Sequence, residues 1–237
     1  MNEAARIGIL GGTLDPIHLG HIEAALAARE ALRLDRVVIV PAHVPPHRSR
    51  PASSPYHRFA MAALAVAGVD GLCVSDVELL APGPSYTADT LHHVANEHGL
   101  ERSQIFFITG ADAFAEIETW KRYPDVLDLA NFVVVSRPGM SLVDLRSRLP
   151  HLRGRMRLPL GRAHSEITSP GETTIFLVDA PTPDVSSTEI RRLIGLGEPV
   201  MGMVPPSVEW HILQHGLYVQ RVPTTSRAEH LHGENRT

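Results

Sequence analysis

The sequence predicts an α/β protein built on a doubly wound, mostly parallel β-sheet. Two observations lead to this prediction. Short runs of β-branched and other apolar residues recur along the chain, and segments with helical spacing of apolar residues lie between them. A short run that is apolar on both faces is typical of a buried parallel strand. Alternation of such strands with helices predicts helices on both faces of one sheet.

The predicted elements follow in chain order. Strands are expected at residues 7–10, 37–40, 105–108, 132–135 and 175–178, with a weaker one at 72–75. Helices are expected at residues 21–32, 56–66, 88–98, 123–129, 142–149 and 187–196. Residues 41–55, rich in Pro, Ser and Arg, and residues 153–172, which lack either periodicity, are predicted surface loops.

Length and composition predict a single folded domain. The chain has 237 residues, of which 43% are hydrophobic and 20% charged, an ordinary globular composition. We expect a single domain over residues 1–219. A disordered tail is expected over residues 220–237, where apolar residues are few.

The charge balance argues against nucleic acid as a partner. The formal net charge is −4, whereas a protein that binds nucleic acid by bulk attraction usually has a basic surface. The arginines between residues 146 and 162 suit a solvated face. No nucleic-acid partner is therefore expected, and a phosphate site must be local.

The lone cysteine and the N-terminal segment indicate the cellular setting. Cys73 cannot form an internal disulfide and lies in an apolar run, so a buried reduced thiol is expected. No stretch has the pattern of a leader peptide or the length needed to cross a bilayer. We therefore expect a cytoplasmic protein with no membrane partner, and assembly into a homo-oligomer stays open.

A glycine-rich turn follows the first predicted strand. Gly11, Gly12 and Thr13 end that strand, and a helix follows a few residues later. Glycine lets the backbone approach a ligand, and a helix N-terminus offers unpaired amides to a phosphate. A glycine pair at a strand end can also simply form a tight turn.

Two histidines strengthen the phosphate interpretation. If the helix begins near Ile17, His18 and His21 are three residues apart and share one face of its first turn, where the helix dipole is positive. Half of a metal site is a weaker interpretation, because no acidic or cysteine partner lies at zinc spacing nearby. A merely packed pair is the third interpretation.

The segment that contains these residues resembles a known family. Residues 11–21, GGTLDPIHLGH, are similar to the signature of the nucleotidyltransferase α/β-phosphodiesterase superfamily, in the form found in bacterial nicotinate-mononucleotide adenylyltransferases. The segment departs from that pattern at Leu14, where the family usually has Phe. The resemblance implies a Rossmann-like nucleotidyltransferase fold and attack of a mononucleotide on the α-phosphate of ATP.

Further blocks resemble the same family in the same order. They are VSSTEIR at residues 185–191, GADAF at 110–114, Trp120, PPHR at 45–48 and SYTADT at 85–90. Taken alone, each block is an ordinary turn, an aromatic residue or a helix start; Thr87, for example, suits an N-cap. The resemblance extends from about residue 6 to residue 218.

The resemblance implies a role for each matching residue. His18 and His21 are the implied catalytic residues. The implied ATP-binding residues are Gly11, Gly12, Thr13, His18, Gly20, His21, Gly110, Asp112, Ser187, Thr188 and Arg191. The implied nicotinate mononucleotide-binding residues are Asp15, His47, Arg48, Tyr86, Thr87 and Trp120.

The implied chemistry needs no protein nucleophile, because the mononucleotide phosphate is already anionic; positioning and charge stabilisation should suffice. Mg²⁺ is expected to arrive with ATP, and no metal-binding residues are expected in the protein. Two rival interpretations remain: a transferase of the same superfamily with another acceptor, such as phosphopantetheine, and a non-catalytic nucleotide sensor.

Overall fold

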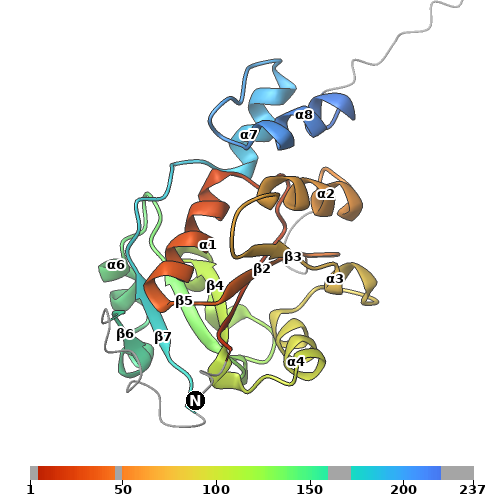
Figure 1. Ribbon diagram of the computed structural model, residues 1–237. Coiled ribbons are helices and arrows are strands. Elements are labelled where there is room, and N and C mark those ends of the chain that lie inside the picture. Colours follow the sequence, from red (N-terminus) through yellow and green to blue (C-terminus); the bar gives the residue numbers. More distant parts are fainter. Residues whose placement is uncertain (1–4, 46–49, 160–171, 220–237) are drawn as a thin grey trace, which may run out of the picture.

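The computed structural model describes residues 5–45, 50–159 and 172–219. Its centre is a seven-stranded sheet in the order β3-β2-β1-β4-β5-β7-β6, in which every pair of neighbouring strands is parallel (Figure 1). The strands are β1 (Ile7–Gly12), β2 (Arg36–Pro41), β3 (Leu72–Val74), β4 (Ile105–Gly110), β5 (Asn131–Val135), β6 (Met156–Arg157) and β7 (Ile175–Val178). The parallel doubly wound sheet and its six predicted strands are confirmed.

Helices surround this sheet. The α-helices are α1 (Leu19–Leu32), α2 (Pro55–Val66), α3 (Val77–Leu80), α4 (Thr87–His98), α5 (Ala111–Phe114), α6 (Leu142–Arg148), α7 (Ser187–Gly195) and α8 (Pro206–Gln214). Four 3₁₀ turns are also described: η1 (Arg102–Gln104), η2 (Ile117–Thr119), η3 (Asp125–Asp128) and η4 (Pro150–Arg155). Five of the six predicted helices are confirmed.

Three predictions need correction. Residues 123–129 contain only the 3₁₀ turn η3 (Asp125–Asp128), with Pro124 as its N-cap. The predicted loop at 153–172 begins with the end of η4 and with β6, which pairs with β7 and buries Met156. The thiol of Cys73 is only partly buried and lies 3.8 Å from the carbonyl oxygen of Val37.

The sheet separates two hydrophobic layers, because successive side chains of a strand point to opposite faces. Leu10 of β1 packs in a core with α1, α2, α7 and α8. Its neighbour Ile9 packs in a core with α4, α5 and α6 on the other face. Both faces of the central strands are therefore covered, which explains why their sequences are apolar throughout.

The strand order fixes where a ligand can bind. Strand β1 lies between β2 and β4. From β1 the chain adds β2 and β3 on one side, and it then crosses to the other side of β1 to add β4 and β5. A crevice opens at the carboxyl ends of the strands where the order reverses in this way. The paired strands β1 and β4 end at Gly12 and Gly110, so the segments that follow them start next to each other at this point.

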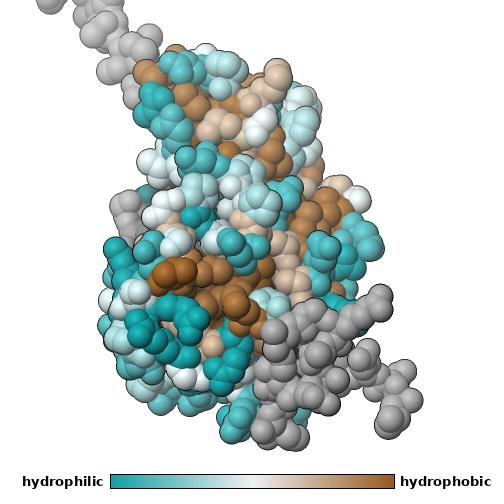
Figure 2. Space-filling model, turned by 90° about the vertical axis from the view of Figure 1, so that its left-hand side faces the viewer, coloured by the Kyte–Doolittle hydropathy of each residue, from teal (hydrophilic) through white to brown (hydrophobic). Residues whose placement is uncertain are grey.

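The last two helices lie beyond this carboxyl edge of the sheet. From the end of β7 the chain runs up to α7 and α8 (Figure 1). In Figure 2 this upper part mixes hydrophilic and hydrophobic surface, and its exposed apolar side chains include Met201, Trp210 and Leu213. No helix within the described ranges is long and apolar enough to span a membrane.

Candidate active site

A cleft of about 970 Å³ opens at the switch point of the sheet. The predicted site residues that line it are Gly11, Gly12, Thr13, Asp15, His21, Tyr86, Thr87, Gly110, Asp112, Trp120, Ser187 and Arg191. They come from the segments after β1 and β4, from the start of α4, from the turn after η2 and from the start of α7. Segments far apart in the sequence therefore form one cavity.

Three predicted residues lie outside this lining, namely His18, Gly20 and Thr188. His47 and Arg48 fall outside the residues that the structure describes.

Hydrogen bonds to two backbone carbonyl oxygens fix the start of the loop after β1. The carbonyl oxygen of Gly12 accepts a 2.8 Å hydrogen bond from the amide of Ala42, next to β2. The carbonyl oxygen of Thr13 accepts a 2.8 Å hydrogen bond from Nη1 of Arg58. In a trans peptide the N–H points opposite to the C=O. The amide of Thr13 therefore points away from Ala42, and the amide of Leu14 points away from the Arg58 guanidinium.

Arg58 is the side chain that fixes this loop. It is fully buried at 0% exposure, and it also donates to the carbonyl oxygens of Ala42 and His43. Burial lowers the pKa of Arg58, an effect opposed chiefly by the nearby Asp15 carboxylate. An arginine stays protonated in proteins, so this cation supplies a fixed set of donors beneath the loop.

Two glycines of the cleft lie where a side chain would collide with neighbouring groups. A Cβ on Gly11 would lie 3.2 Å from the Phe107 ring. A Cβ on Gly110 would lie 2.5 Å from a carboxylate oxygen of Asp112 and 3.2 Å from the Arg137 side chain. Larger residues at these two positions would displace the groups that form the floor and wall of the cleft.

The two histidines stack at the start of α1. The helix begins at Leu19 with His18 as N-cap, two residues later than the expected start near Ile17. Their ring centroids are 3.8 Å apart, and the amide of His18 donates to Nδ1 of His21 at 3.3 Å. His21 lines the cleft, whereas the His18 ring lies behind it at 1% exposure.

The environment of His18 keeps its ring neutral. Burial, and secondarily the positive charge of Arg137, lower its pKa from 6.5 to about 3. Its Nδ1 is buried and has no hydrogen-bond partner among the described residues. His18 therefore acts as a neutral imidazole at neutral pH. It can donate one N–H but cannot supply a positive charge.

Gly20 acts through His18. A Cβ at Gly20 would lie 3.1 Å from Cε1 and Nδ1 of the His18 ring and 3.6 Å from the carbonyl oxygen of Pro183. The absence of a side chain at this position lets the imidazole lie against the first turn of α1. Gly20 therefore bears on the cleft only through the position of the His18 ring.

The carboxylate of Asp15 is occupied by protein donors. Its oxygens accept hydrogen bonds from the amide of Ala52 at 2.7 Å, from the hydroxyl of Ser53 at 2.5 Å and from the hydroxyl of Tyr218 at 2.7 Å. Asp15 is only 3% exposed. The geometry does not favour direct contact between this carboxylate and a mononucleotide, and the residue instead ties three segments together.

The start of α7 faces the loop after β1. Ser186 caps the helix by accepting from the amide of Glu189. The hydroxyl of Ser187 donates to the carbonyl oxygen of Pro16 at 2.8 Å, and Nη1 of Arg191 donates to the carbonyl oxygen of Asp15 at 2.6 Å. Nη2 of Arg191 lies 3.3 Å from the hydroxyl of Thr188. Arg191 thus places a cation at the cleft while bracing the loop.

The other end of the cleft carries aromatic rings. Tyr86 is the N-cap of α4 and Thr87 is its first residue. Thr87 was expected to be the N-cap, so the helix begins one residue earlier than predicted. The Trp120 ring stands edge-on to Phe107 with centroids 5.9 Å apart, so it is anchored on the core. Nζ of Lys121 lies 4.0 Å from the centre of the Tyr86 ring and 3.0 Å from a carboxylate oxygen of Asp89.

Several residues of the site are not among those predicted from the sequence. Arg50, Lys121 and Arg137 line the cleft and add three cations to Arg191. Arg137 comes two residues after the end of β5, and this position after a strand end was the signal that could have identified it. Arg58 carried no such signal, because an arginine on an amphipathic helix usually faces solvent.

Comparisons with known proteins agree with this geometry. The family model described as cytidylyltransferase-like matches residues 9–193. A protein of Pelobacter propionicus named "Probable nicotinate-nucleotide adenylyltransferase" is 38% identical over 216 residues, covering 90% of this chain and 98% of its own. A protein of the same name from Roseiflexus sp. is 41% identical, covering 91% of this chain and 98% of its own.

Solved structures support the fold. A nicotinic acid mononucleotide adenylyltransferase of Plasmodium falciparum, complexed with NaAD, matches with a TM-score of 0.68 and 16% identity. The match covers 91% of this chain and 98% of that one. At that identity the match shows the fold alone. From the family model and the sequence relatives, the chain belongs to the cytidylyltransferase-like family and, within it, to the group of nicotinate-nucleotide adenylyltransferases.

Proposed function

We propose that this chain transfers the adenylyl group of ATP to nicotinate mononucleotide, giving nicotinate adenine dinucleotide and pyrophosphate in NAD biosynthesis. One observation carries the proposal. The segments after β1 and β4 and the start of α7 converge on one cleft at the switch point of the sheet, where His21, Gly110 and Arg191 all line it. That arrangement suits a nucleoside triphosphate.

In this reaction a phosphate oxygen of the mononucleotide forms a bond to the α-phosphorus of ATP. The bond from that phosphorus to the bridging oxygen breaks, and pyrophosphate leaves with the electron pair. The nucleophile is already anionic, so the protein positions the reactants and stabilises the developing charge. The Thr13 amide and the imidazole of His21 are the groups we assign to the α-phosphate, and His18 is assigned to the same step through its stacking on His21.

On the ATP side, we assign Gly11, Gly12, Gly110 and Asp112 to the nucleoside and its first phosphate. Arg191, with the hydroxyls of Ser187 and Thr188, is assigned to the β- and γ-phosphates, because this cation lines the cleft beside the loop after β1. Gly20 supports this set through His18.

Mg²⁺ enters this proposal as part of the substrate MgATP. Among the described residues that line the cleft, no three metal-ligating side chains lie close enough together to hold an ion. The Asp15 carboxylate is already occupied by protein donors. We therefore expect phosphate oxygens and water to hold the ion, as is usual for Mg²⁺ with nucleotides.

On the mononucleotide side, we assign Trp120 to the pyridine ring and Tyr86 and Thr87 to its carboxylate end. Lys121 supports this assignment, since its ammonium group lies 4.0 Å from the centre of the Tyr86 ring and can favour a carboxylate over a carboxamide. His47 and Arg48 are proposed to bind the phosphate of the mononucleotide. Asp15 is proposed to act by ordering the loop rather than by touching the substrate.

We further propose that residues 1–219 act as one catalytic unit and that the enzyme works in the cytoplasm, where ATP is made and consumed. No nucleic acid is expected as a partner, in keeping with the net charge of −4.

The function is tested by pyrophosphate release from MgATP with three acceptors compared side by side: nicotinate mononucleotide, nicotinamide mononucleotide and phosphopantetheine. We expect turnover with the first and a much lower kcat/KM with the other two. Turnover with phosphopantetheine alone would assign the chain to a different acceptor. Nucleotide binding without release of pyrophosphate from ATP in the presence of any of the three acceptors would make it a sensor.

A further inference from the structure

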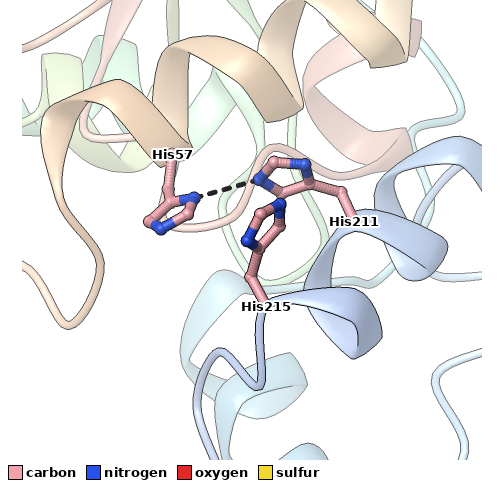
Figure 3. A group of neighbouring side chains, drawn as sticks. All are labelled: His57, His211 and His215. Atoms are coloured by element: carbon pink, nitrogen blue, oxygen red, sulfur yellow. Dashed lines mark hydrogen bonds between the residues drawn. The ribbon is translucent and has the colours of Figure 1, made fainter.

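Three histidines meet away from the cleft, at the junction of α2 and α8 (Figure 3). His57 comes from the first turn of α2, and His211 and His215 come from the last turn of α8 and its C-cap. One ring nitrogen from each of the three lies within 4.8 Å of those of the other two. None of the three lines the cleft of the proposed adenylyl transfer.

The spacing of the pair on α8 suits a metal. His211 and His215 are four residues apart, so they lie on one face of a helical turn, and the amide of His215 still donates to the carbonyl oxygen of His211 at 3.2 Å. Two histidines at this spacing on a helix form a recurrent pair of zinc ligands. His57 supplies a third nitrogen from 154 residues earlier in the chain.

The distances suit a small tetrahedral ion. Zinc–nitrogen bonds of about 2.0–2.1 Å place two nitrogens of a tetrahedron about 3.3 Å apart. Nδ1 of His57 and Nε2 of His211 are already 3.1 Å apart. The ligand nitrogen of His215, whose side chain is exposed, lies within 4.8 Å of the other two.

The surroundings favour the ligand form of the rings. His211 is 8% exposed. Burial, followed by the proximity of His215 and then His57, lowers its pKa below the usual value. A metal binds the neutral imidazole, which is the form that burial favours at His211.

The donor chemistry selects the class of ion. Three imidazoles without a carboxylate or thiolate suit zinc and its neighbours among the divalent transition metals, whereas Mg²⁺ and Ca²⁺ prefer oxygen ligands. We propose that His57, His211 and His215 form a binding site for a divalent transition ion of the Zn²⁺ class, with water as fourth ligand, which fastens α8 to α2.

The three-histidine site joins α8 to the helix that carries Arg58. His57 precedes Arg58, whose side chain holds the loop after β1. The same two helices are also joined by a hydrogen bond from the hydroxyl of Ser207 to the carbonyl oxygen of Leu64 at 3.0 Å. An ion at the site would therefore cross-link the last described helix to the element that positions the catalytic loop.

The experiment uses the full chain without an affinity tag, stripped with a chelator and titrated with ZnCl₂ by calorimetry. We expect one high-affinity Zn²⁺ per chain. At free Zn²⁺ about 100 times the Kd, the melting temperature should rise by about 5–10 °C. Co²⁺ should give the visible absorption of a tetrahedral site.

The variant that tests the assignment is His57→Gln with His215→Gln, which spares the buried His211. Its matched control is His93→Gln with His98→Gln, two exposed histidines of α4. The site variant should lose the high-affinity Zn²⁺ and the thermal shift, and the control should keep both. Equal binding by the two variants, or none by the unchanged protein, would overturn the proposal. Pyrophosphate release by each variant is measured separately, so failure of the catalytic assignment would be visible on its own.

Discussion

Nη1 of Arg58 donates a 2.8 Å hydrogen bond to the carbonyl oxygen of Thr13, and this partly buried contact orients the loop after β1. Arg58→Ala removes it together with the bonds to Ala42 and His43, leaving three carbonyl groups without this donor. We expect the free energy of unfolding to fall by about 3 kcal/mol or more. The measurement is urea unfolding.

The Lys variant separates charge from geometry. Arg58→Lys keeps the positive charge, but an ammonium group lacks the planar fork with which the guanidinium reaches three carbonyl oxygens. We therefore expect kcat to fall, while the urea midpoint of unfolding changes less than for Arg58→Ala. Arg192→Lys, at an exposed arginine paired with Glu189, is the matched control and should resemble the unchanged protein. Full activity in Arg58→Lys would show that the loop does not depend on this fork.

His21→Ala tests the side chain that we assign to the α-phosphate. Removing one donor from a developing charge typically lowers kcat about 10²–10³-fold. The KM for ATP should change little, because the interaction strengthens in the transition state. His98→Ala, at an exposed position on α4, is the control. Near-normal kcat in folded His21→Ala protein would remove this residue from the mechanism.

The pH dependence of stability reports on His18. In the unfolded chain a histidine binds a proton below about pH 6.5. In the folded protein His18 binds one only near pH 3. Between these values the unfolded state holds more protons, so stability rises with pH and is lost as the pH falls. The contribution of a single such group approaches roughly 1.4 kcal/mol for each pH unit.

This dependence is measured by urea unfolding between pH 4.5 and 7.5 in the unchanged protein and in His18→Gln, which cannot titrate. The slope against pH should be shallower in the variant, whatever its absolute stability. Parallel slopes would mean that the His18 ring is protonated as easily in the folded protein as in the unfolded chain.

The parts of the molecule that could be predicted are those whose signal is local. Runs such as residues 105–108 predict a strand because burial on both faces demands apolar residues in sequence. The Gly11–Gly12 turn and His21 were identifiable because a strand end, glycines and a helix start lie within a few residues of one another. Parallel topology then brings the next strand end, at Gly110, to the same place.

The parts that could not be predicted depend on contacts between distant segments. The hydrogen bond from Tyr218 to Asp15 joins residues 203 positions apart, and the sequence contains no sign of it. Arg58 has the sequence context of a surface residue, yet it is fully buried because the carbonyl groups of two other loops surround it. Local patterns record propensity and burial, whereas these pairings depend on tertiary structure.

Tyr218→Phe tests how the last described segment supports the site. The hydroxyl of Tyr218 donates to the buried Asp15 carboxylate at 2.7 Å. Burial, and next the charge of Asp15, raise the pKa of Tyr218, so the hydroxyl remains a donor. Loss of a hydrogen bond to a charged group should lower the free energy of unfolding by about 1.5–3 kcal/mol.

The matched control for Tyr218→Phe is Tyr56→Phe, since Tyr56 is 75% exposed. Chemical unfolding of the two variants should differ by most of the predicted amount. If they unfold alike, Asp15 is satisfied by Ala52 and Ser53 alone, and the Tyr218 hydroxyl adds nothing to stability.

Gly20→Ala separates stability from catalysis. Alanine is favoured over glycine in a helix by about 0.5–1 kcal/mol, so the substitution should not weaken α1 through its backbone. The added Cβ would lie 3.1 Å from the His18 ring, which must shift and carry the stacked His21 with it. We therefore expect kcat to fall about tenfold or more, because small displacements at a reacting centre are costly. Gly154→Ala, where a Cβ meets nothing within 4 Å, is the control in the same pyrophosphate assay. Equal kcat for the two variants would show that the position of the His18 ring does not matter to the reaction.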